Sequence, residues 1–145
     1  MFKIIRALKS ALNWTAALNF ASEREYSKAL DKLKTNEKLS NKAVSQVTLL
    51  KAYLLLKLNK DEETVATLKF FLPLIEDDDR YNSPDRDYLI AYASWIIMSL
   101  PEPLSNQFSS FDIPKSIDDI SEVPLKNVKD SLKRIFPLEV HKRWI

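Results

Sequence analysis

The side chains best suited to chemistry are carboxylates that gather between positions 76 and 87. Oxygen ligands of this kind suit calcium or magnesium, but the run lacks the alternating ligand spacing and the glycine of an EF-hand loop. Acid–base catalysis would also need a pocket that perturbs the carboxylates. We therefore interpret the run as a solvated acidic loop and, with two tyrosines of the following helix, as the candidate partner-binding surface. Its residues are Glu76, Asp77, Asp78, Asp79, Asp85, Asp87, Tyr88 and Tyr92.

Other residue types exclude most catalytic and cofactor sites. His141 is the only histidine, and its nearest acid, Glu139, would project elsewhere on a strand or a helix. The chain has no cysteine, which excludes disulfides, thiolate metal sites and thiol nucleophiles. It has no glycine, so phosphate-binding loops, dinucleotide-binding turns and nucleophile elbows are excluded too. We predict no enzyme, no cofactor, no metal site and no small-molecule substrate.

Charge is distributed unevenly along the sequence. Residues 1–60 hold 12 Lys or Arg and 4 Asp or Glu, residues 61–122 hold 4 and 14, and residues 123–145 hold 6 and 2. Such blocks either neutralise each other across packed helices or present two distinct electrostatic surfaces to partners.

The first helix combines cations with an apolar stripe. Residues 2–21 contain Lys3, Arg6 and Lys9, and no acid precedes Glu23. At helical spacing the same residues form an apolar stripe of Ile4, Leu8, Leu12 and Ala16. A membrane surface or a nucleic-acid backbone would attract such a segment. We favour the alternative, a packed helix with a solvated basic face.

The spacing of apolar residues predicts helices along most of the chain. The second begins near Glu23, because Ser22 and Glu25 have the spacing of a capping box, and it frays over residues 34–38. The third, over 41–58, is apolar around most of its circumference and is expected to be the buried centre.

Further along, charged residues and prolines set the expected boundaries. A fourth helix begins near Asp61 and is kinked or ended by Pro73. A fifth begins at Ser83 as cap, with Pro84 in its first turn, and runs to about Leu100. A last helix covers 122–136. We predict one all-α domain, 1–145, divided into a repeat-like core (14–75), an acidic loop with an aromatic helix (76–100), an extended segment (101–120) and a C-terminal helix with a tail (121–145).

The helical core resembles a tetratricopeptide repeat. The pattern is carried by Trp14, Ala17, Phe20, Tyr26, Ala29 and Leu33, with a second copy in Leu49, Ala52, Leu56, Val65 and Leu72 and a partial third from Ser83. The resemblance implies antiparallel hairpins stacked in a right-handed superhelix whose concave face holds a peptide or a partner surface. A generic bundle of five or six helices, with its aromatic stripes as core, is the alternative.

The segment 101–120 has three prolines and no helical period, yet bulky apolar residues recur in it. They are Phe108, Phe111, Ile113, Ile117 and Ile120. Because exposing them all would be unfavourable, we expect the segment to dock in extended form on the helices. It either completes the core of the third repeat or occupies the groove that a partner peptide would use.

These patterns favour a non-enzymatic module that binds one protein partner. A bacterial toxin-immunity protein, its partner being a toxin or secreted effector, and a small chaperone or adaptor both fit. The alternative is a basic-surface binder of RNA or of an anionic membrane through the N-terminal helix, and affinity that collapses with salt would support it. No window has the roughly 20 apolar residues that span a bilayer, and we expect a cytoplasmic protein.

Overall fold

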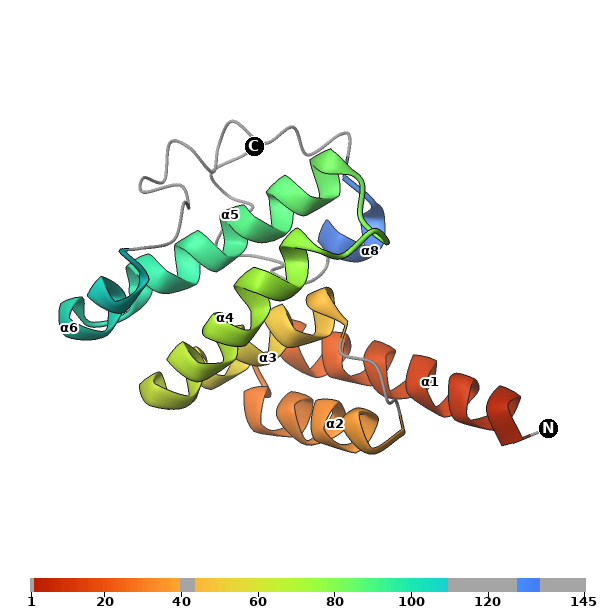
Figure 1. The fold of residues 1–145 in the computed structure, drawn as a ribbon. Coiled ribbons are helices and arrows are strands. Elements are labelled where there is room, and N and C mark those ends of the chain that lie inside the picture. The colour runs from red at the N-terminus through yellow and green to blue at the C-terminus, as the bar shows by residue number, and fades with distance from the viewer. Residues whose placement is uncertain (1, 40–43, 110–127, 134–145) are drawn as a thin grey trace.

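The computed structural model describes residues 2–39, 44–109 and 128–133, and within them every regular element is a helix (Figure 1). This confirms the predicted all-α class. In chain order the elements are α1 (Phe2–Ser22), α2 (Tyr26–Leu39), α3 (Ser45–Lys57), α4 (Asp61–Glu76), α5 (Ser83–Ser99), α6 (Glu102–Ser105), the 3-10 turn η1 (Asn106–Phe108) and α8 (Asp130–Lys133). None of these helices is long and apolar enough to cross a lipid bilayer.

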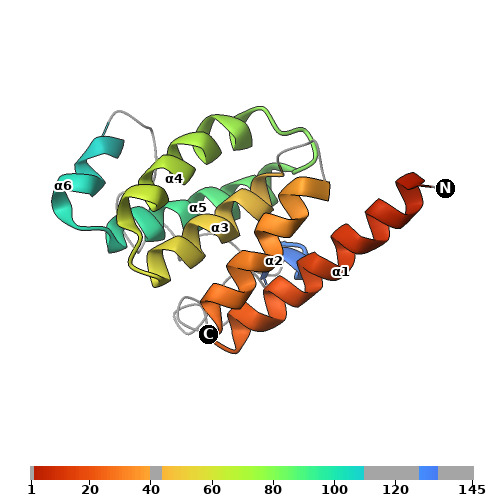
Figure 2. The ribbon, with the colours of Figure 1, turned by 90° about the horizontal axis from the view of Figure 1, so that it is seen from below.

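Successive helices pair as hairpins. Helix α1 packs on α2 and α3 packs on α4, while α3 also contacts α2 and α5 (Figures 1 and 2). Ala17, Ala29 and Ala52 are fully buried, as expected where small side chains allow close helix approach. The two helical hairpins predicted for residues 14–75 are therefore observed.

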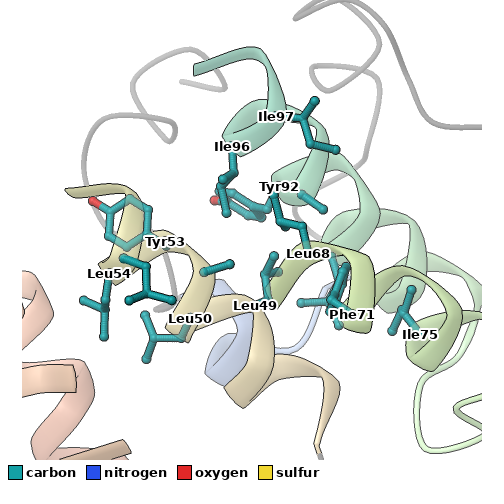
Figure 3. Packing of buried hydrophobic residues seen from close by; sticks show 14 of the residues in the cluster. Leu49, Leu50, Tyr53, Leu54, Leu68, Phe71, Ile75, Tyr92, Ile96 and Ile97 are labelled. Carbon is teal, nitrogen blue, oxygen red and sulfur yellow. The ribbon is translucent and has the colours of Figure 1, made fainter. Parts of the chain in front are cut away.

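Helix α3 is the centre of the core, as predicted. Leu49, Leu50 and Leu54 are fully buried along it. Figure 3 shows Leu68 and Phe71 of α4 on one side of the cluster and Tyr92 of α5 beside them. Because α3 has neighbours around most of its circumference, its sequence is apolar nearly all round.

The turns inside both hairpins use left-handed backbone without glycine. Arg24 has φ 63° and Asn59 has φ 61°. Around Arg24, the amide of Glu25 donates to the carbonyl of Phe20 at 2.8 Å. The turn at Asn59 repeats this bond pattern, which closes a helix C-terminus as a Schellman motif.

The predicted capping box at the start of α2 is wrong. Ser22 is the last residue of α1, and its Oγ donates backwards to the carbonyl of Asn19 at 2.8 Å. Glu25 accepts from Lys28 Nζ at 3.0 Å. The turn closes the end of α1 instead, so α2 begins only at Tyr26.

Two helices continue where the sequence predicts weakening. Helix α2 runs through 34–38 to Leu39, and Asn36 is buried one turn after Leu33. Helix α4 continues past Pro73 to Glu76. Proline removes the bond to the carbonyl of Lys69, but both residues are exposed, so water can solvate that carbonyl.

The remaining boundaries differ from prediction in detail. Asn82, rather than Ser83, caps α5, because its Oδ1 accepts from the amide of Asp85 at 3.2 Å. Residues 102–108 form short helical turns instead of an extended strand-like segment, and Phe108 is buried in the core.

The expected last helix is seen only as α8, and residues 128 and 129 are not helical. The rest of 122–136 lies outside the described residues. So do Phe111, Ile113, Ile117 and Ile120 of the expected docking segment, as well as His141.

Candidate functional site

The eight residues predicted to bind a partner separate into an exposed and a buried set. Glu76, Asp77, Asp79 and Asp87 are exposed. The buried set, with exposed fractions of 0–7%, is Asp78, Asp85, Tyr88 and Tyr92. The interpretation as a solvated acidic loop is therefore wrong for Asp78 and Asp85, since their carboxylates have partners inside the fold.

Asp78 joins the α4–α5 loop to the first residue of α3. Ser45 Oγ donates to Asp78 Oδ2 at 2.8 Å, and Arg80 donates from Nε to Oδ1 and from Nη2 to Oδ2, both at 2.8 Å. The hydrogen bonds from Arg80 lower the pKa of Asp78 from 3.8 to about 2, against the opposing effect of burial. This carboxylate links the loop to α3, and Asp78 is 7% exposed, so little of it is accessible to a partner.

The rest of the loop is held in the same way. The Tyr81 hydroxyl accepts from the amide of Gln46 at 3.4 Å, and Arg86 Nη2 donates to the carbonyls of Asp78 and Tyr81 at 3.1 and 3.3 Å. Asp85 Oδ1 accepts from the amide of Lys129 at 3.2 Å, which ties the segment before α8 to the first turn of α5. The α4–α5 loop and the first turn of α5 are therefore hydrogen-bonded to the start of α3 and to the segment before α8.

Tyr88 and Tyr92 belong to the interior of α5. Their hydroxyls lie 2.8 Å apart, and their rings meet edge to face with centroids 4.6 Å apart. Burial raises the pKa of both hydroxyls well above the ordinary value. The pair stabilises the core and is not part of a surface that a partner reaches in this structure.

A row of aromatic rings instead crosses α2, α3 and α5. Tyr26 and Tyr53 meet at a centroid distance of 6.1 Å, and Tyr53 and Trp95 at 6.1 Å. Lys57, one helical turn after Tyr53, places Nζ 5.6 Å from the Tyr53 ring and 5.8 Å from the Trp95 ring. Both contacts have the geometry of a cation–π interaction.

This row ends at an open pocket, hereafter the Trp95 pocket, with a volume of about 530 Å³. It lies where the end of α3, the α3–α4 turn and the end of α5 meet. Its lining residues are Leu56, Lys57, Asn59, Asp61, Trp95, Ser99, Leu100 and Pro101. The lining mixes apolar side chains with a cation, a carboxylate and other polar groups, a combination found at protein interfaces.

The sequence analysis did not predict this pocket, although the spacing of some of its residues indicates that they lie close together. Trp95 belonged to the helical stripe of α5, and the four-residue spacing of Tyr53 and Lys57 predicts a ring beneath an amine. The approach of α5 to the α3–α4 turn has no local signature, so the pocket itself was not predictable.

The first half of α1 also differs from its prediction. Ile4, Leu8 and Leu12 are 68%, 60% and 69% exposed, so the expected packed helix is wrong for this half. Only from Trp14 onward does α1 bury apolar side chains, because α2 lies against that half.

Among the described residues, no group of three or more His, Cys, Asp or Glu side chains is arranged to hold a metal ion. No family model matches the sequence, and no curated protein and no solved structure is similar enough to match it either.

Proposed function

We propose that this chain is a non-enzymatic protein that binds one protein partner at the Trp95 pocket. The observation that carries the proposal is a half-buried tryptophan, stacked near a tyrosine and a lysine, at the edge of an open cavity. Tryptophan and tyrosine anchors of this kind dominate the binding energy of protein interfaces.

The proposal includes a tetratricopeptide-like stacking of the hairpins in a right-handed superhelix. Its support is the pairing of α1 with α2 and of α3 with α4, with alanines at the crossings. Trp95 and Tyr53 lie on α5 and α3, the helices that would line the concave face of such a superhelix. A toxin-immunity protein, a small chaperone and an adaptor all use binding without chemistry, and the cytoplasm is the proposed location.

A photo-crosslinking experiment tests the pocket. A photoreactive amino acid replaces Ser99, an exposed residue of the pocket, and in a second variant it replaces Ser83, an exposed serine at the other end of α5. The two positions are about 24 Å apart along the helix. We expect one predominant crosslinked protein from the cells that make this chain, trapped from Ser99 and not from Ser83.

The purified crosslinked protein then gives an affinity. Ser99→Tyr fills the pocket without changing charge or removing a buried side chain, and we expect it to weaken binding at least tenfold. Ser83→Tyr makes the same change at the far end and is expected to bind normally. Equal affinities for the two variants, or equal crosslinking from the two positions, would show that the partner does not use this pocket.

A further inference from the structure

The first half of α1 carries an apolar surface that no other described helix covers. Ile4, Ile5, Leu8 and Leu12, hereafter the α1 stripe, are 68%, 46%, 60% and 69% exposed. Figures 1 and 2 both show this half of α1 extending beyond α2, with the N-terminus away from the other helices. Exposed apolar side chains that are contiguous, rather than scattered, mark interaction surfaces.

Helix length explains part of this exposure. Helix α1 has 21 residues and α2 has 14, and a short turn joins the end of α1 to the start of α2. In such an antiparallel pair the surplus falls at the start of α1, where about seven residues, or about 10 Å of helix, extend past α2. The overhang accounts for Ile4, Ile5 and Leu8, but Leu12 lies beyond it.

The side of α1 on which the stripe lies explains why Leu12 is exposed as well. With 3.6 residues per turn, the α1 stripe covers an arc of about 100° on the opposite side of the helix from Ala17 and Ala21, while Leu18 lies about 40° from the edge of the stripe at Ile4. Ala17, Leu18 and Ala21 are buried in the core. A longer α2 would therefore still leave Leu8 and Leu12 uncovered, because they face away from the side that contacts α2.

The charged residues of this half of α1 are all positive, and at helical spacing Lys9 lies about 40° from Ile5 at the edge of the stripe, whereas Arg6 lies about 100° from Ile5. Arg6 and Lys9 are exposed, and residues 2–22 contain no acid. Arg6 and Lys9 lie beyond the first turn of α1, where the helix dipole has little effect on them, and the first turn has no acid, whereas α4 begins with Asp61, Glu62 and Glu63. A helix half that carries cations and no carboxylate is attracted to an anionic surface.

We propose that the first half of α1 binds the surface of an anionic phospholipid membrane, lying in its plane. The α1 stripe enters the boundary between headgroups and acyl chains, Lys9 at its edge reaches the lipid phosphates, and Arg6 on the upper side of the helix adds attraction to the anionic surface within a Debye length. The helix lies on the bilayer and does not cross it.

Charge and composition favour this occupant over two others. A second copy of α1 would bring two positively charged helices together, with no carboxylate in residues 2–22 to pair with their cations. A groove on a protein is usually anchored by tryptophan, tyrosine or arginine in the contact centre, whereas the α1 stripe is entirely aliphatic. Membrane binding is independent of the Trp95 pocket, which lies on other helices.

The test is flotation of the full-length chain with two kinds of vesicle, phosphatidylcholine alone and phosphatidylcholine mixed with phosphatidylglycerol. We expect binding to the mixed vesicles only, and weaker binding as salt is raised. Arg6→Gln with Lys9→Gln removes two cations, each worth about fivefold in affinity. Lys34→Gln with Lys60→Gln, two exposed lysines outside α1, makes the same charge change and is expected to bind nearly normally.

The apolar contribution has its own pair of variants. Leu8→Gln with Leu12→Gln is expected to lower binding at least tenfold, because each side chain loses apolar area that would leave water. Phe70→Gln, which changes a side chain 56% exposed on α4, is the control and is expected to bind normally. Since all these positions are exposed, urea unfolding curves should be unchanged, which separates lost binding from lost folding.

Three results would overturn the proposal. The first is no binding to the mixed vesicles at low salt, and the second is equal binding by the stripe variant and its control. The third is self-association in sedimentation velocity that Leu8→Gln with Leu12→Gln abolishes while vesicles fail to bind, which would assign the stripe to a second copy. Ser99→Tyr must leave vesicle binding unchanged, so a failure of the pocket hypothesis and a failure of this one are distinguishable.

Discussion

Replacing Asp78 with asparagine isolates the charge that holds the α4–α5 loop. The side chain of Asp78 is 4% exposed and that of Arg80 is 49% exposed, and the two meet at 2.8 Å. Lowering the pKa of Asp78 from 3.8 to about 2 corresponds to about 2 kcal/mol of folding stability. Because water and salt screen the half-exposed Arg80, we expect Asp78→Asn to lose about 1–2 kcal/mol at pH 7.

The pH dependence follows from the sign of this shift. The carboxylate ionises more readily in the folded protein, so its stabilisation is complete above the unfolded pKa of 3.8 and is lost as the pH falls through about 2. Asparagine cannot ionise, so the stability difference between the two proteins should close between about pH 4 and about pH 2.

Urea unfolding followed by far-UV circular dichroism, repeated across this pH range, measures the difference. At neutral pH the expected loss of stability lowers the melting temperature of Asp78→Asn by roughly 2–8 °C. Asp79→Asn removes the same charge from the exposed neighbouring residue and is expected to change stability little. The reasoning fails if the two variants are equally stable at pH 7, or if the Asp78 difference is as large at pH 2 as at pH 7.

Two further predictions concern the exposed acids and the short helical turns. Neutralising Glu76, Asp77, Asp79 and Asp87 together should slow association with a basic partner and flatten its salt dependence in stopped-flow measurements; unchanged kinetics would reduce these residues to a solubility feature. Phe108→Ala should cost about 3–5 kcal/mol in urea unfolding, because Phe108 is 2% exposed. Phe70→Ala, at 56% exposed, is its control, and equal costs would contradict a core role for Phe108.

The helical hairpins were predictable because their signals are local. Ala17 and Ala29 mark a close crossing, and the acids at 61–63 mark the start of α4, within a few residues of the structure they determine. Helix boundaries were predicted less accurately where two neighbouring residues can both cap the helix. Asn82 and Ser83 both accept hydrogen bonds as helix caps, and only the position of the Asp85 amide decides between them.

The division of the acidic residues was not predictable, because it depends on contacts distant in sequence. Asp77, Asp78 and Asp79 are chemically identical, and only Asp78 meets Ser45, 33 residues away. Asp85 accepts from Lys129, 44 residues away. A run of carboxylates usually predicts an exposed loop. Asp78 and Asp85 are exceptions because hydrogen bonds and nearby cations compensate the cost of removing their carboxylates from water.

Helix α1 shows how one sequence pattern can predict the helix and still mislead about its packing. The sequence places Ile4, Leu8, Leu12 and Ala16 on one apolar stripe of α1, whereas the residues that the structure packs in the core run from Trp14 to Ala21. Which side of α1 faces the core depends on the length and position of α2, which the turn at Arg24 determines. Once α2 occupies the side that Ala17 and Ala21 present, the stripe of Ile4, Leu8 and Leu12 must face away from it. The amphipathic pattern predicts that α1 is a helix, but within the α1–α2 hairpin nothing buries these three side chains. Only a surface outside the hairpin can bury them.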